Sequence, residues 1–230
     1  MLEQMRKHMN WIMWTILVLI IVTFLFFGIY PSGEGRGVAA TVNGETISMT
    51  ELNRVYRNLS ETYRQIFKDQ FTDALAKSLR GQALRELVQN RLLVQEASRM
   101  GLRVSDDELR DTIMRIPSFS PGGRFDQATY ERYLDYINTK PSAFEESQRE
   151  SLLRQKLERI IEGGVEVTDT EVQEAYAKRN PKAKAEEFAK NRDAFRKSLL
   201  SEKQRTAVEA FVRGLEKKSK ITTTEEAAAS

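Results

Sequence analysis

Residues 38–51 read VAATVNGETISMTE, and this stretch predicts how the fold begins. Asn43 and Gly44 stand between two short β-prone runs, and Asn-Gly at such a place is the strongest short-range signal for a β-hairpin. Ser48 and Glu51 have the spacing of a capping box, in which each side chain accepts a hydrogen bond from the other residue's backbone amide. We therefore expect a hairpin that leads directly into a helix.

From this hairpin to residue 218, apolar residues recur at intervals of three and four, which predicts a mainly α chain. Capping residues, prolines and glycines mark where the helices begin and end. Asn-Pro at 180–181 interrupts the pattern, because the residue before a proline is disfavoured in a helix. The predicted helices lie at about 49–67, 72–100, 105–116, 126–137, 141–163, 168–179 and 183–218, and a β-prone segment follows at 221–224.

The loop at residues 117–126, PSFSPGGRFD, is the most distinctive segment outside the helices. Its prolines and glycines enforce turns around Phe119 and Phe125, and tyrosines follow on the next helix. If these rings are exposed, they suit an adaptable apolar surface that holds unfolded chains without reading their sequence. The alternative is that they close the core of the domain itself. The candidate residues for binding unfolded clients are Met114, Ile116, Phe119, Phe125, Tyr130 and Tyr133.

Residues 11–30 read WIMWTILVLIIVTFLFFGIY, and no Asp, Glu, Lys or Arg lies between Lys7 and Glu34. At about 1.5 Å of rise per residue, this stretch crosses a hydrocarbon core of about 30 Å. A cleaved secretory signal has a shorter apolar run of about 7–15 residues, and a buried core helix is the other alternative. Aromatic rings near both ends suit the headgroup region and favour a transmembrane anchor. These rings belong to Trp11, Trp14 and Tyr30.

The charges that flank this anchor predict its orientation. Arg6 and Lys7 precede it, whereas Arg36 on the other side is balanced by Glu34. The positive-inside rule therefore places residues 1–10 in the cytoplasm. The large domain that follows the anchor then lies on the other side of the membrane.

The composition argues against catalytic and cofactor chemistry in the soluble part. The chain has no cysteine, and its single histidine, His8, precedes the anchor. The acidic pairs at 106–107 and 145–146 stand in the first turns of helices, where negative charge offsets the helix dipole. The glycines at 122–123 lack the lysine of a phosphate-binding loop. We therefore expect no cofactor, no metal site and no enzymatic activity.

The formal net charge of +3 is unevenly distributed along the chain. Residues 177–220 are strongly basic, whereas residues 45–176 carry a net negative charge. The basic segment lacks the aromatic and glycine-containing motifs that accompany nucleic-acid binding. A solvated helix face is the preferred interpretation, and nucleic acid is not an expected partner. Whether this segment touches lipid headgroups is left open by the sequence.

The order of these segments resembles the SurA and PpiD family of periplasmic chaperones, most closely its membrane-anchored members. The resemblance covers about residues 10–178 and includes the anchor. None of its motifs is catalytic, but their order and spacing together are fairly specific. The segments that carry it are VNGETIS (42–48), NRLLVQEASRMGLRVSDDEL (90–109), IPSFSPGGRFDQATYERYL (116–134) and VTDTEVQEAY (167–176).

This resemblance implies an ATP-independent chaperone in the bacterial inner membrane, with its soluble domain in the periplasm. The implied partners are unfolded or nascent secretory polypeptides, membrane lipid and, as a further candidate, the Sec export machinery. The resemblance also implies that the last strand pairs beside the hairpin. The expected divisions are an anchor at 11–30, a linker at 31–37, a SurA-like helical domain at 38–178, a helix and strand that complete it at 179–224, and a disordered tail at 225–230.

The chain departs from the family pattern after the helix at 171–178. In the family a parvulin-type prolyl isomerase domain usually follows this helix, whereas here a helical, lysine-rich segment follows. Parvulin sites also use histidines, and His8 lies on the other side of the anchor. We therefore expect a chaperone without isomerase activity. The alternative function is a membrane-anchored scaffolding subunit that binds one folded partner.

Overall fold

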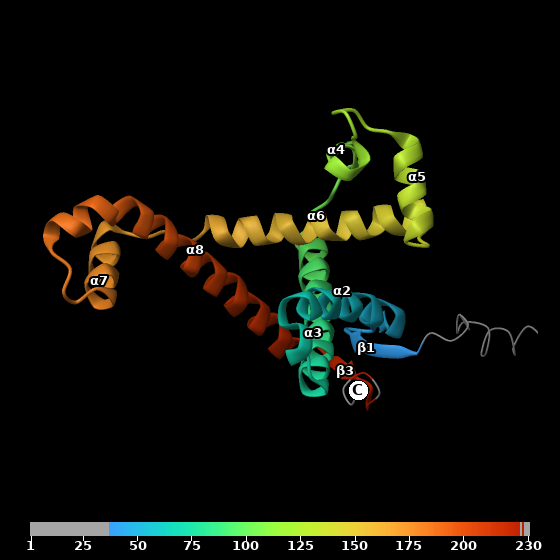
Figure 1. The fold of residues 1–230 in the computed structure, drawn as a ribbon, viewed down its shortest axis with the longest axis horizontal. Helices are drawn as coiled ribbons and strands as arrows, with labels where there is room; N and C mark the ends of the chain where they lie inside the picture. The colour runs from blue at the N-terminus through green and yellow to red at the C-terminus, as the bar shows by residue number, and fades with distance from the viewer. Residues whose placement is uncertain (1–36, 226, 228–230) are drawn as a thin grey trace, which may run out of the picture. The chain divides into compact units, whose positions relative to one another are not determined.

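The computed structural model describes residues 37–225 and 227, which form a mainly helical fold with one small sheet (Figure 1). The prediction of a mainly α domain is thereby confirmed. The elements are β1 (Val38–Val42), β2 (Glu45–Ser48), α2 (Met49–Phe67), η1 (Lys68–Gln70), α3 (Asp73–Arg99), α4 (Asp106–Met114), η2 (Pro117–Phe119), α5 (Gln127–Tyr136), α6 (Pro141–Gly163), α7 (Asp169–Arg179), α8 (Ala185–Lys218) and β3 (Ile221–Thr223).

The predicted anchor at 11–30 and its ends at Trp11, Trp14 and Tyr30 lie outside the described residues, as do residues 1–10 and 31–36. Among the helices of residues 37–225 and 227, none is both long and apolar enough to span a bilayer.

The predicted hairpin and capping box are both confirmed. Asn43 and Gly44 have φ angles of 52° and 91°, which is the signature of a type I′ turn. The side chain of Ser48 accepts a hydrogen bond from the Glu51 amide at 3.2 Å, and the Glu51 carboxylate accepts one from the Ser48 amide at 2.8 Å. Helix α2 therefore starts directly at the end of β2.

The sheet is completed by the distant strand β3. The strand order is β2-β1-β3, and β1 pairs antiparallel with both neighbours. In the pairing with β3, Ala40 faces Thr223 and Val42 faces Ile221. The expected return of the last strand to the hairpin is therefore confirmed, and it closes one edge of a hairpin that is marginal alone.

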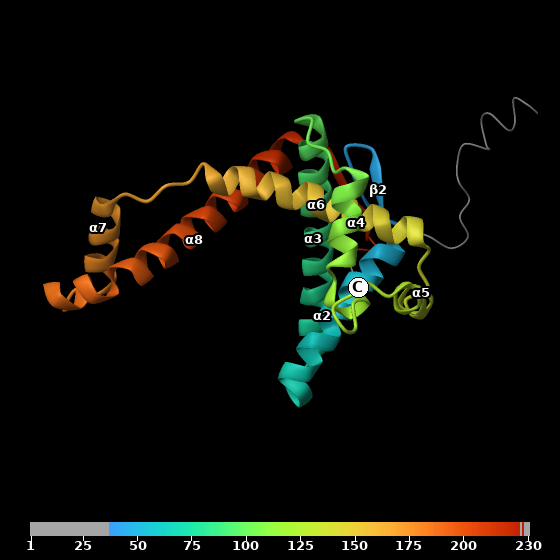
Figure 2. The same ribbon diagram turned by 90° about the horizontal axis from the view of Figure 1, so that it is seen from above.

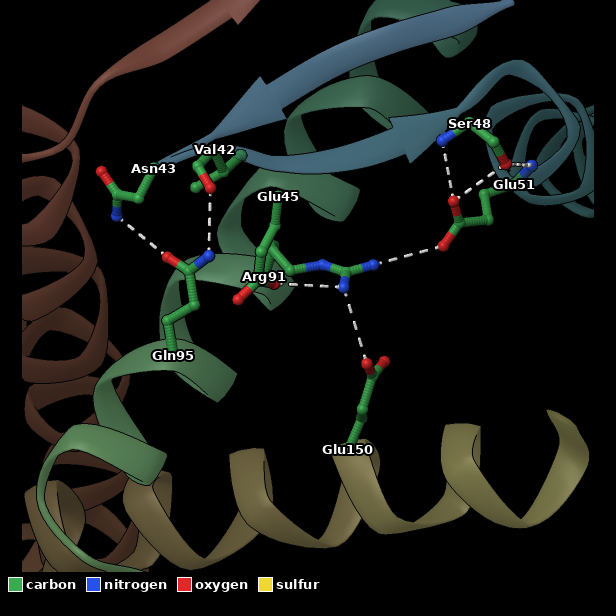
Figure 3. A network of polar contacts seen from close by, with 8 residues as sticks. All are labelled: Val42, Asn43, Glu45, Ser48, Glu51, Arg91, Gln95 and Glu150. Atoms are coloured by element: carbon green, nitrogen blue, oxygen red, sulfur yellow. Dashed lines mark hydrogen bonds and ion pairs between the residues drawn. The ribbon is translucent and has the colours of Figure 1, made fainter. Parts of the chain in front are cut away.

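Asn43 joins three distant parts of the chain at this turn. Its side-chain oxygen accepts a hydrogen bond from the Lys220 amide at 2.9 Å. Its side-chain nitrogen donates to Gln95 on α3 at 2.9 Å and to the hydroxyl of Ser219 at 3.2 Å. Gln95 in turn donates to the carbonyl of Val42 at 3.0 Å, and Figure 3 shows this pair of contacts from α3 to the turn.

The remaining helix boundaries follow their predicted signals. After α3, the amide of Leu102 bonds to the carbonyl of Ala97 and that of Gly101, at φ 80°, to Ser98, which is a Schellman motif. Pro141 occupies the first turn of α6, and α7 ends before Asn180. Side-chain caps begin α3, α4, α5 and α7 at Thr72, Ser105, Asp126 and Thr168.

The buried side chains form separate clusters rather than one core. The first cluster joins the sheet to α2 and α3, and it includes Ala227, which is 1% exposed. The segment 225–230 was predicted as a disordered tail, but Ala227 belongs to this core, while 226 and 228–230 lie outside the described residues. The second cluster joins α4, η2 and α5 to the first half of α6.

Two further clusters involve the long helix α8. One lies where α3, α6 and α8 meet, and it contains Leu93, Leu157 and Val212. The other joins α7 to the first half of α8 around Val172 and Leu199. Figures 1 and 2 show α6 and α8 linking these regions. The groups of helices are therefore held to one another mainly through α3, α6 and α8.

Arg91 on α3 lies among three glutamates (Figure 3). Its guanidinium is 3.3 Å from Glu45, 3.3 Å from Glu51 and 3.7 Å from Glu150 on α6. Partial burial raises the pKa of Glu150, the nearby carboxylates raise it further, and Arg91 opposes this shift. One cation thus faces three carboxylates, so the ionised form of Glu150 is disfavoured in the folded protein.

Glu150→Gln is expected to raise the free energy of unfolding at neutral pH. A carboxyl group with a raised pKa in the folded state contributes stability at low pH that is lost as pH rises through that pKa. The advantage of the variant over the parent should therefore shrink as the solution is acidified from about pH 8 to about pH 4 in urea titrations. The matched control is Glu61→Gln on α2, where the side chain is exposed and does not contribute to the pKa shift of Glu150, with an expected change within about 0.5 kcal/mol. A pH-independent gain for Glu150→Gln would contradict this account.

Candidate functional site

The loop between α4 and α5 turns its first phenylalanine inward. Gly122 and Gly123 have φ angles of 88° and 82°, a conformation that only glycine adopts without strain. The carbonyl of Phe119 accepts a hydrogen bond from the Asp126 amide at 2.8 Å, which closes the loop. Asp126 then caps α5 by accepting from the Thr129 amide at 2.7 Å, and hydrogen bonds from Thr129 lower its pKa.

The aromatic residues of this region converge on Phe119. Its ring centroid lies 5.3 Å from that of Tyr130, 5.1 Å from that of Tyr133 and 5.9 Å from that of Phe144 on α6, all in edge-on arrangements. Phe125 reaches Tyr130 at 5.9 Å. The predicted grouping of the rings is therefore present. It also includes Phe144, which the sequence did not distinguish from the other apolar residues of α6.

The six predicted client-binding residues divide between interior and surface. Phe119 and Tyr130 are buried, with 2% and 6% of their surfaces exposed, so they close the local core as the alternative interpretation held. Met114 and Tyr133 are 44% and 40% exposed, and Ile116 and Phe125 are half-buried. The part that these residues play in binding stays a prediction.

A groove of about 510 Å³ lies between α4, α5 and the start of α6. Its apolar lining consists of Leu109, Ile113, Met114, Phe125, Tyr130 and Pro141. Its polar lining consists of Asp106, Arg110, Gln127, Glu131, Glu145 and Arg149. The groove therefore combines an apolar wall with charges of both signs, and it contains three of the six predicted residues.

Sequence reasoning missed the inner wall of this groove. Leu109 and Ile113 are buried, at 5% and 7% exposure, and they stand four residues apart on one face of α4. That spacing was visible in the sequence as an apolar stripe. What the spacing did not reveal is that α5 and Pro141 of α6 lie across from this face.

Ion pairs and hydrogen bonds hold α4 on α6. Arg149 donates to the carbonyl of Val104 at 2.7 Å and to Asp106 at 2.8 Å. Lys156 donates to the carbonyl of Arg103 at 2.7 Å and to Glu108. Asp106 is thus engaged in a structural contact, in line with the helix-end interpretation of the pair at 106–107. The same interpretation of the pair at 145–146 was wrong, because α6 begins at Pro141 and its first turn contains no acidic residue. The contacts with Arg149 and Lys156 keep one wall of the groove in place.

The sequence profile of the SurA-like N-terminal domain matches residues 1–158, which is well over half of the chain. The chain belongs to the SurA-like N-terminal domain family. All residues that line the groove lie within the matched segment. The groove is therefore a feature of the SurA-like domain, whereas α7, α8 and β3 follow the matched segment.

Three curated relatives show distant homology to this SurA-like chain. The periplasmic chaperone PpiD of Escherichia coli (strain K12) is 28% identical over 165 residues, which cover 68% of this chain and 26% of that protein. PpiD of Haemophilus influenzae is 30% identical over 155 residues, covering 64% and 24%. The chaperone SurA of Burkholderia orbicola is 30% identical over 148 residues, covering 64% and 31%. The chain thus spans about a quarter to a third of the length of these relatives.

A solved structure supports the SurA-like fold. It comes from work on two structurally related SurA-like chaperones of Campylobacter jejuni, and it superposes with a TM-score of 0.52 at 12% sequence identity. The superposition covers 82% of this chain and 99% of the other. The shared fold therefore extends beyond residue 158 to include elements after the matched segment.

Proposed function

We propose that this chain is an ATP-independent chaperone that binds apolar segments of unfolded polypeptides in the groove between α4, α5 and α6. The observation that carries the proposal is the groove itself, where exposed Met114 and half-buried Phe125 border a buried wall of Leu109 and Ile113. Methionine and aromatic side chains adapt to varied apolar partners. The names of the relatives, periplasmic chaperone PpiD and chaperone SurA, support the same function.

Residues 11–30 are part of this proposal as an inner-membrane anchor, with residues 1–10 in the cytoplasm and the folded domain in the periplasm. The residues at 31–37 serve as the linker between them. Support comes from the uncharged apolar run and from the aromatic residues at its ends. Tethering raises the concentration of binding sites beside the membrane, so that weak contacts with newly exported chains become effective.

The proposed chaperone acts without prolyl isomerase chemistry. Helices α7 and α8 are joined by residues 180–184, and they pack against each other around Val172 and Leu199. The one histidine of the chain is His8, at the other end of the sequence. A proline-peptide assay on the full chain should give an isomerisation rate equal to the uncatalysed background, which takes tens of seconds at about 25 °C.

Met114→Glu tests the groove as the client-binding site. The full chain, reconstituted in lipid nanodiscs, should slow the aggregation of an unfolded model protein at stoichiometric amounts. The variant places a charge on the apolar border, and we expect it to weaken client affinity by about fivefold, which corresponds to about 1 kcal/mol. Affinity is measured from the fluorescence anisotropy of a labelled, reduced and carboxymethylated α-lactalbumin.

The matched control is Ile160→Glu, because Ile160 is 51% exposed on α6 but does not line the groove. This variant should bind the probe as the parent does. Equal losses of client affinity in Met114→Glu and Ile160→Glu would show that clients do not bind specifically in the groove. Capture of a single folded partner at fixed stoichiometry, with no effect on aggregation, would favour the scaffolding function instead.

A further inference from the structure

The hydroxyl of Tyr130 has no hydrogen-bond partner among the residues that the structure describes. Tyr130 is 6% exposed, its oxygen is buried, and the residue lines the groove. Leaving a buried hydroxyl unpaired is unfavourable by about 1–3 kcal/mol. The residue that carries this orphaned oxygen therefore lines the groove in which we propose that a client segment binds.

Packing alone does not explain why this residue is a tyrosine. Its ring contacts Phe119, Phe125 and Phe144 at centroid distances of 5.3, 5.9 and 5.9 Å. A phenylalanine ring would make the same contacts without burying an unpaired oxygen. Burial, and to a lesser degree the carboxylate of Glu145, raise the pKa of Tyr130. The hydroxyl is therefore protonated at neutral pH and available as a donor.

The charges of the groove indicate which kind of acceptor fits. Three carboxylates, those of Asp106, Glu131 and Glu145, line it together with two arginines. Arg149 is paired with Asp106, and Arg110 is paired with Asp107. A client carboxylate would therefore chiefly meet repulsion from Glu131 and Glu145, whereas a neutral carbonyl oxygen would not. Every unfolded chain carries such carbonyls whatever its sequence, and they lack partners within an extended segment.

We propose that the Tyr130 hydroxyl is a client-binding group that donates a hydrogen bond to a main-chain carbonyl of an extended apolar segment in the groove. This inference rests on the proposed function. The apolar wall takes a client side chain, while Tyr130 binds the backbone next to it. Since the oxygen is covered in the structure, side chains at the border shift when the segment enters, and Met114, exposed and unbranched, is the most adaptable of them.

Tyr130→Phe in the full chain tests this assignment with two readouts. The midpoint of urea unfolding should stay unchanged or rise, because the variant removes an unpaired buried oxygen. The dissociation constant for the labelled α-lactalbumin should increase by about fivefold, as expected for one lost hydrogen bond. The same increase is expected for an acetylated and amidated peptide of leucine and alanine, in which only the backbone supplies acceptors.

The matched control is Tyr136→Phe, because Tyr136 is 87% exposed at the end of the same helix and does not line the groove. Tyr136→Phe should change neither the midpoint of urea unfolding nor the dissociation constant for the client. Unchanged affinity of Tyr130→Phe would overturn the inference, and so would a lower unfolding midpoint, since that result reveals a partner within the protein. If Met114→Glu weakens binding and Tyr130→Phe does not, only this inference fails. If neither variant has an effect, the proposed binding site fails as well.

Discussion

Asn43→Ala should lower the free energy of unfolding by about 2–3 kcal/mol, measured by urea denaturation followed with circular dichroism. The variant loses the hydrogen bonds that the Asn43 side chain donates to Gln95 and Ser219 and the one that it accepts from the Lys220 amide. It also places alanine at a φ of 52°, where residues other than asparagine and glycine are strained. The loss is large because one side chain joins the turn, α3 and the start of β3.

Asn138→Ala is the matched control for this prediction. Asn138 has a similar φ of 48° and is exposed after α5, so its replacement removes the conformational preference without breaking a long-range junction. We expect a loss of about 1 kcal/mol from backbone strain. Equal losses for the two variants would show that the bonds to Gln95, Ser219 and Lys220 contribute no net stability.

Phe119→Ala should lower the free energy of unfolding by about 3–5 kcal/mol, the range typical of a deleted buried aromatic side chain. Phe119 is 2% exposed, and its ring meets those of Tyr130, Tyr133 and Phe144. Its removal leaves a cavity that the surrounding rings fill only in part. The control Tyr136→Ala, at a position 87% exposed, should change stability by less than about 0.5 kcal/mol.

The loss of stability in Phe119→Ala should also be confined mainly to the elements that surround Phe119. The cluster around Phe119 is separate from the cluster that joins the sheet to α2 and α3. Hydrogen exchange should therefore accelerate most in α4 and α5, and least at the amides of β1. The affinity of this variant for clients should also fall, because α4 and α5 form walls of the groove. Uniform acceleration across the domain would contradict the independence of the two clusters.

The segment that follows residue 158 is part of the same fold. Val212 of α8 packs with Leu93 and Leu157, and β3 pairs with β1 in the sheet. The family match at residues 1–158 therefore covers the groove but not all the elements that support it. Variants truncated after α6 would lose β3 and the α8 side of this cluster, so they are poor tools for testing the function of the groove.

The local features of this protein were predictable from its sequence. The hairpin turn at Asn43 and Gly44, the capping box at Ser48 and the end of the helix at about residue 100 all appear as expected. Each depends on residues within about four positions of one another, where backbone geometry and side-chain hydrogen bonds decide the outcome. The order of elements therefore followed from short-range chemistry.

The candidate site, in contrast, was decided by the tertiary structure. The sequence grouped Met114, Phe119, Phe125 and Tyr130, but it did not show that Phe119 and Tyr130 would be buried while Met114 remained exposed. That division depends on where α6 crosses α4 and α5. Burial is a property of packing between distant segments, and a periodic apolar pattern shows only which face of a helix is available for it.

Neighbouring residues suffice to specify the turn, the caps and the approximate extents of the helices. Packing between distant segments was needed to bring Asn43 to Gln95 and Ser219, to place Arg91 among three glutamates and to form a groove lined by Tyr130. Asn43 and Ser219 are 176 positions apart. Contacts over such separations form only when the whole chain has folded, so no local sequence pattern specifies them.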